Sequence, residues 1–128
     1  MNIYKAIREN IFFNKFISQN MLNEVLIGNI EIYWNSIVIH IHTNCKPAIE
    51  ISKYGVWGEN YNTISIELFA IIKGEIKIKN REFMTYAPVE VQKTLEGYLI
   101  KQEGDNWSIS FEIIGDFLFR RISSTYIQ

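Results

Sequence analysis

The stretch WGENYNTISIELFAIIKGEIKIK, residues 57–79, decides the fold, because no other segment holds one clear period for as long. Its centre alternates polar and apolar side chains: Thr63, Ile64, Ser65, Ile66, Glu67 and Leu68. A period of two is typical of a strand with one buried face. Apolar positions resume after Gly74, which leaves two interpretations: a hairpin with its loop at residues 73–75, or one long strand bent at Gly74. We favour the hairpin, because strands usually span about 3–10 residues.

The residues before this stretch predict a second hairpin, over 22–43. A two-residue turn at Asn35 and Ser36 would pair three residues of each strand on one face: Trp34 with Ile37, Ile32 with Ile39, and Ile30 with Ile41. Burial selects a register that keeps apolar side chains on one face. The opposite face would then set Glu31 against His40, and Asn29 against His42.

The last third of the chain predicts a meander. A turn at Gly104 and Asp105 would pair Ile100 with Ile109 and Tyr98 with Phe111. A second turn at Gly115 and Asp116 would lead into a final strand over 117–123. Between the two main strand regions, residues 44–62 are mostly loop, with a short strand at 49–51.

The N-terminal segment, residues 2–18, is the best helix candidate, because Ile3, Ile7 and Ile11 recur every four residues. Asn10 and Asn14 weaken its middle, so two short helices are the alternative. The sequence therefore predicts one α+β domain over 1–128. Its N-terminal helix, or pair of short helices, packs on a twisted, mostly antiparallel sheet of about seven strands. A sheet curled into a half-barrel is the alternative shape.

Composition excludes several classes of function. The net charge of −1 lacks the basic excess of a general nucleic-acid binder. The sequence contains no run of about 18 apolar residues, so it predicts no membrane span. A lone cysteine, Cys45, needs no oxidising compartment, and because Lys5, Arg8 and Glu9 stand where a signal peptide would begin its apolar core, we expect no signal peptide. We therefore expect a cytoplasmic protein that contacts neither nucleic acid nor membrane.

The residues that carry chemistry form no convincing catalytic or metal set. His40 and His42 share one strand face, with Cys45 three residues beyond, but a zinc site would need a further carboxylate. A solvated face on which His40 pairs with Glu31 is the simpler interpretation. The glycines spell no nucleotide-binding loop. We expect no enzyme, no cofactor and no metal.

The strongest surface candidate is an aromatic loop with nearby carboxylates. Its predicted partner-binding residues are Tyr54, Trp57, Glu59, Tyr61 and Glu67. Aromatic side chains beside a carboxylate are typical of binding hot spots. The alternative is that Trp57 and Tyr61 close one end of the sheet as core.

The same region resembles a family of small bacterial immunity proteins, which neutralise toxin domains of contact-dependent inhibition and other polymorphic toxin systems. In that family a tryptophan shortly precedes an asparagine and an alternating strand, here Trp57, Asn60 or Asn62, and residues 64–68; a second strand follows, here residues 75–79. The resemblance implies a cognate toxin domain as partner and inhibition by tight binding without catalysis. If the toxin is a nuclease, its active-site cleft is basic, and we expect an acidic patch with Glu50, Glu59 and Glu67 as candidates to face it.

Two further functions stay open at this point. A carrier of a lipid-like small molecule would hold its ligand in a cavity of the curved sheet, lined by the abundant Ile and Phe residues. An enzyme is disfavoured by the lack of an acid, base or nucleophile set. A homodimer formed by sheet extension is also open.

Overall fold

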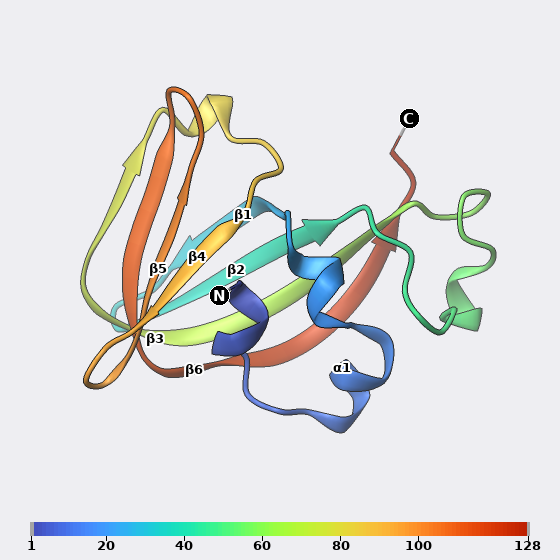
Figure 1. Ribbon diagram of the computed structural model, residues 1–128, viewed down its shortest axis with the longest axis horizontal. Helices are drawn as coiled ribbons and strands as arrows, with labels where there is room; N and C mark the ends of the chain where they lie inside the picture. The colour runs from blue at the N-terminus through green and yellow to red at the C-terminus, as the bar shows by residue number, and fades with distance from the viewer. Residues whose placement is uncertain (1, 128) are drawn as a thin grey trace.

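The computed structural model describes residues 2–127 and consists mainly of one antiparallel sheet with the strand order β1-β2-β3-β6-β5-β4 (Figure 1). Its strands are β1 (Leu26–Ile32), β2 (Ser36–Thr43), β3 (Thr63–Lys79), β4 (Val89–Lys93), β5 (Gly97–Glu103) and β6 (Ser108–Thr125). The α+β class and the antiparallel sheet are thus confirmed. The strand count is corrected from about seven to six within the described residues, and the sheet is not closed.

The two longest strands, β3 and β6, explain the lower count, because each runs on where a turn was predicted. Gly74 and Gly115 both have positive φ, 77° and 71°, which glycine adopts without steric cost. The β3–β6 register shifts beside each of them, so both glycines form bulges and not chain reversals. The predicted hairpin at 73–75 and the predicted turn at Gly115 and Asp116 are therefore wrong. The long strand bent at Gly74 is the observed form.

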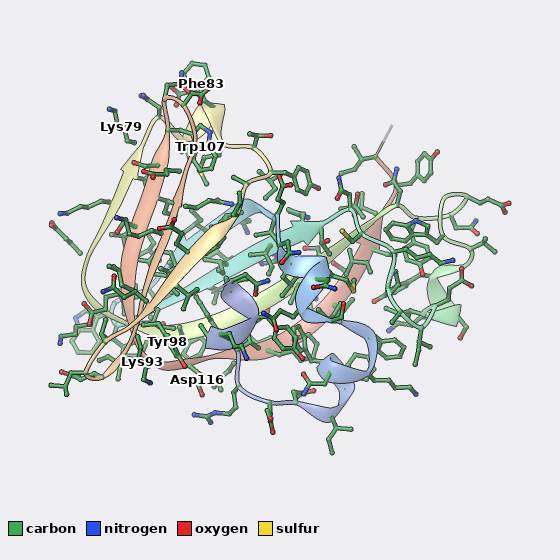
Figure 2. All side chains as sticks on the ribbon, viewed as in Figure 1. Lys79, Phe83, Lys93, Tyr98, Trp107 and Asp116 are labelled. Carbon is green, nitrogen blue, oxygen red and sulfur yellow. The ribbon has the colours of Figure 1, made fainter. Side chains whose placement is uncertain are left out.

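These bulges bend the sheet into two arms (Figure 1). One arm holds β1, β2 and the adjoining halves of β3 and β6. The other holds β4, β5 and the remaining halves. Tyr98 and Asp116 lie at the bend, whereas Lys79 and Trp107 lie at the far end of the second arm (Figure 2).

Both tight hairpins form, but with a register that differs by two residues from the prediction. Tyr33 N–H donates to the Ser36 carbonyl at 2.9 Å, so the first turn consists of Trp34 and Asn35. In the second, Gly104 N–H donates to the Trp107 carbonyl at 2.9 Å, and Ile100 pairs with Phe111. A shift of two keeps Ile30 and Ile32 opposite the isoleucines of β2, because the side-chain period of a strand is two, but it moves Trp34 from the predicted pair with Ile37 into the turn. Alternation therefore predicts the buried face and not the turn.

The N-terminal segment forms short helices and not one long helix: η1 (Ile3–Ala6), α1 (Ile11–Phe16) and η2 (Gln19–Leu22). The Asn2 side chain accepts a hydrogen bond from Tyr4 N–H, and the Asn10 side chain accepts one from Phe13 N–H. Asn10 thus begins α1 as its N-cap, which is why the predicted helix is interrupted there. The predicted strand at 49–51 is absent from the described residues, and η3 (Ser52–Tyr54) follows instead. A last short helix, η4 (Arg81–Phe83), follows β3.

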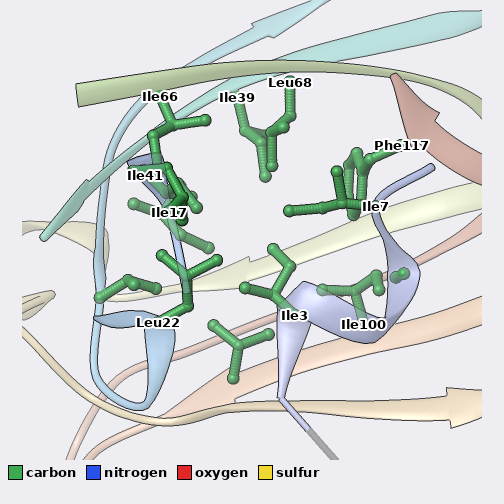
Figure 3. Close-up of a cluster of buried hydrophobic side chains, with 14 of the residues drawn as sticks. Ile3, Ile7, Ile17, Leu22, Ile39, Ile41, Ile66, Leu68, Ile100 and Phe117 are labelled. Carbon is green, nitrogen blue, oxygen red and sulfur yellow. The ribbon is translucent and has the colours of Figure 1, made fainter. Parts of the chain in front are cut away.

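The hydrophobic core lies in the angle between the two arms. Ile39, Ile41, Ile66 and Leu68 of the sheet meet N-terminal side chains such as Ile3 there (Figure 3). The buried core is dominated by branched aliphatic and aromatic residues, so the concave side of the sheet is filled by the chain's own side chains. Among residues 2–127, no helix is long and apolar enough to cross a membrane.

One buried polar side chain joins the two edges of the sheet. Gln102 of β5 is 2% exposed, and its Nε2 donates to the carbonyls of Val25 and Ala87 at 2.8 and 2.9 Å. Val25 precedes β1 and Ala87 precedes β4, and their backbones exchange two hydrogen bonds of 3.1 Å. The starts of the edge strands therefore meet, while β1 diverges from the second arm beyond this point.

Candidate functional site

The structure brings the three aromatic residues of the predicted partner-binding loop together. Tyr61 is fully buried, and its ring lies 5.6 Å from the Tyr54 ring and 5.2 Å from the Trp57 ring, both in edge-to-face geometry. Such contacts add to the free energy gained by burying the rings. Tyr61 therefore has no exposed surface to offer a partner, and Trp57 is half-buried against it.

Hydrogen bonds fix this aromatic cluster, Tyr54, Trp57 and Tyr61, to the sheet. The Tyr54 hydroxyl donates to the Ile122 carbonyl of β6 at 2.9 Å. Burial, and then the neighbouring Tyr61, raises the pKa of Tyr54 above its ordinary value. Gly58 N–H donates to the Tyr61 carbonyl at 2.7 Å, which closes the loop on itself. The cluster is built as a plug at the start of β3.

The two predicted carboxylates lie on different elements, Glu59 in the loop and Glu67 on β3. Glu59 is exposed in the loop that carries Trp57. Glu67 alternates with the core residues of β3 and so lies on the outer face of the sheet. There its Oε1 is 3.4 Å from His40 Nε2 and 3.5 Å from Arg121 Nε. The five predicted residues therefore do not form one continuous surface.

The histidine pair lies on the same outer face, with partners that differ from the prediction. His40 stands opposite Asn29 and contacts Glu67, so the predicted pairing with Glu31 is wrong; the two-residue register shift is the cause. Burial, and then the nearby His40, lowers the pKa of His42. Within residues 2–127, no group of three or more His, Cys, Asp or Glu side chains is placed to hold a metal ion.

A different surface, along β1, presents several exposed apolar side chains. β1 is an edge strand and pairs with β2 alone. The backbone N–H of Tyr33 points toward β2, because it donates a hydrogen bond to the Ser36 carbonyl. Because neighbouring residues of an antiparallel pair alternate in direction, Ile30 and Ile32 turn their backbone N–H and C=O groups toward the open edge. These groups are available to a further strand.

An open groove of about 580 Å³ runs beside this edge. Its lining is Leu26, Ile27, Gly28, Asn29, Ile30, Ile32, Ile78, Arg81, Glu82 and Met84. The far wall thus belongs to the end of β3 and to η4, where Phe83 lies (Figure 2). That half of β3 pairs only with β6, so the groove separates two strands that each lack a neighbour on this side.

The tip of the β1–β2 hairpin extends this apolar surface. Trp34 is 97% exposed, and Ile32 and Tyr33 are 58% and 55% exposed. Phe83 of η4, next to the lining residues Glu82 and Met84, is 53% exposed. We name these exposed apolar residues, together with the groove, the β1 surface.

The sequence prediction missed the β1 surface, because the register that it favoured paired Trp34 with Ile37 on the buried face. The turn residues gave a usable signal. Asparagine is favoured in turns, and Asn35 lies within both candidate turns, the observed one at residues 34–35 and the predicted one at residues 35–36. Placing the turn one residue earlier would have exposed Trp34.

Comparison with known proteins identifies no relative of this chain. No family model matches the chain, and neither a curated protein nor a solved structure matches it significantly.

Proposed function

We propose that this chain is an immunity protein that binds and neutralises a cognate bacterial toxin domain, without catalysis. The observation that carries the proposal is the β1 surface. There an exposed tryptophan, an exposed tyrosine and an open strand edge lie along a groove lined by both apolar and polar residues. The resemblance of residues 57–80 to small immunity proteins supports a toxin domain as the class of partner, and the exposed residues of the β1 surface support this surface as the proposed binding site.

The residue types of the β1 surface favour a protein as the partner. Tryptophan and tyrosine are the most frequent hot-spot residues of protein interfaces. A groove beside an unpaired strand accepts an extended segment, which gains affinity from backbone hydrogen bonds. Trp34 can insert into a pocket of the partner at low entropic cost, because its side chain has only two rotatable bonds.

The predicted acidic patch supports this proposal less well than the β1 surface does. Glu50 Oε1 lies 3.9 Å from Lys46 Nζ, and Glu67 contacts His40 and Arg121. Two of the three predicted carboxylates thus have a basic neighbour within the chain. A partner that docks on the β1 surface would be recognised mainly through apolar and backbone contacts.

The alternative of a lipid-like carrier places its ligand on the concave side of the sheet. That side is filled by packed core side chains, among them Ile3, Ile41 and Leu68 (Figure 3). The present observations therefore favour the binding function over the carrier.

The test is co-expression of the tagged chain with the open reading frames next to its gene, followed by affinity purification. We expect a one-to-one complex with a neighbouring toxin domain in the cytoplasm, and restored growth of cells that express that toxin. Purified chain should not consume the toxin or its substrate. Growth that stays inhibited, with no complex formed, would refute the proposal. Recovery of a dimer of the chain alone would assign the open edge to self-association.

A further inference from the structure

A separate pocket of about 330 Å³ lies between α1 and residues 49–53 and shares no lining residue with the groove beside β1. It is lined by Phe12, Lys15, Phe16, Ile49, Glu50, Ile51, Ser52 and Lys53. Its volume is near the lower end of the range for small-molecule sites, about 300–1,000 Å³. The pocket is thus large enough for a small ligand.

The apolar half of the pocket lining, Phe12, Phe16, Ile49 and Ile51, is built on packed residues. The Phe12 and Phe16 rings meet edge to face at 5.1 Å, and Phe12 also stacks on Phe119 of β6 at 6.1 Å. Phe16 and Ile51 are buried beneath the surface, whereas Phe12 and Ile49 are about half exposed. An apolar chain laid against these exposed side chains would remove them from water.

The rim of the pocket carries a positive charge. Lys15 Nζ lies 5.4 Å from the centre of the Phe16 ring, and Lys53 Nζ lies 5.2 Å from that of Tyr54. Within the described part of the chain, neither ammonium group has a carboxylate within 4.0 Å. The one acid of the lining, Glu50, lies 3.9 Å from Lys46. Two lysines without acidic partners therefore flank an apolar surface.

We propose that this pocket binds a single-chain amphiphile with a carboxylate head, of the fatty-acid class. The carboxylate pairs with Lys15 and Lys53, which can both reach one anion because their side chains are long and flexible. The apolar chain lies against Phe12 and Ile49. Neutral and cationic amphiphiles lack the head group that the rim complements. This site is independent of the toxin and of the β1 surface.

The test is a titration of the full-length, ¹⁵N-labelled protein with sodium decanoate below its micelle concentration, followed by NMR. We expect saturable chemical-shift changes confined to the amides of residues 11–16 and 49–54. Decanol and decyltrimethylammonium at equal concentrations should bind several-fold more weakly. Equal binding of all three amphiphiles, or shifts centred on β1, would overturn the proposal.

Two variants separate the charge from the apolar wall. Lys15→Gln with Lys53→Gln should weaken decanoate binding about threefold to tenfold, as expected for the loss of two exposed ion pairs. The matched control, Lys5→Gln with Lys79→Gln, removes two exposed lysines outside the pocket and should leave the affinity unchanged. Ile49→Ser should weaken decanoate binding while the spectrum stays that of a folded protein. Unchanged affinity in the Lys15 and Lys53 variant would refute the proposed carboxylate contact.

Discussion

Trp57 and Trp34 stand in two loops that adjoin strands of the same sheet, and the two loops are built in opposite ways. Around Trp57 the chain folds back on itself, and the ring packs on the buried Tyr61, which also contacts Tyr54. Around Trp34 the chain makes a two-residue turn, and the ring is 97% exposed. One loop thus closes an end of the sheet, while the other leaves a large apolar side chain in water.

The difference shows how loop length decides whether an aromatic residue becomes core or surface. The segment between β2 and β3 is long enough to bring Tyr54, Trp57 and Tyr61 together over the start of β3. A two-residue turn has no residues to spare for covering its own tip. Exposure of Trp34 forgoes the free energy that burial would give, and such exposed apolar side chains mark interaction sites when they cluster.

The largest expected effect lies in the closed loop. Tyr61→Ala should lower the free energy of unfolding by about 3–5 kcal/mol, because it removes a fully buried aromatic ring and leaves a cavity. Urea denaturation followed by tryptophan fluorescence measures this change. Tyr61→Phe keeps the ring and should stay within about 1 kcal/mol of the native chain.

Tyr33→Ala at the open hairpin is the matched control for that experiment, since it also removes a tyrosine ring. Tyr33 is 55% exposed, so its loss should change the free energy of unfolding by only about 0.5 kcal/mol. A similar loss of stability in the Tyr33 and Tyr61 variants would show that the two loops are not built differently.

The next effect concerns binding. Trp34→Ala should weaken binding of the proposed toxin domain by at least about 2 kcal/mol, roughly a 30-fold rise in Kd, if Trp34 is an interface anchor. The melting temperature should not change, because the ring makes little contact within the chain. Calorimetric titration of the complex measures the Kd. Leu95→Ala removes a side chain that is equally exposed, at 97%, in the β4–β5 turn, and should leave the Kd unchanged.

How far the sequence could predict these regions depends on what the pattern encodes. Alternation along residues 63–68 predicts the strand and its buried face correctly, because burial imposes a period of two. It does not distinguish a turn from a bulge at Gly74 or Gly115, since glycine with positive φ occurs in both. That choice depends on whether β6 runs alongside β3, which is a long-range contact.

The candidate site was less predictable than the fold, for a related reason. The aromatic residues of the 54–61 loop are conspicuous in sequence, yet their mutual contacts are set by the loop's path over β3. Trp34 is conspicuous too, but whether it is buried or exposed depends on a turn that shifts by one residue. The groove beside β1 depends on the bend of β3, so no local pattern reveals it.

The smallest expected effect is a pH dependence of the free energy of unfolding, caused by His42 on β2. His42 of β2 pairs with Leu26 of β1 and Ser65 of β3, and its ring lies directly over Gly28. Burial, then His40, lowers the pKa of His42 from its ordinary value of 6.5. Between 6.5 and the lower folded pKa, the unfolded chain binds more protons than the folded chain, so the free energy of unfolding falls as the pH decreases through this range. Above about pH 6.5 this contribution is fully present and constant.

Melting temperatures recorded from pH 8 to about pH 5 should therefore decline in the acidic half. The slope should become shallower in His42→Gln and persist in His40→Gln. An unchanged slope in the His42 variant would show that another group titrates in this range. The packing of β1 against β2 would then not depend on the protonation state of His42.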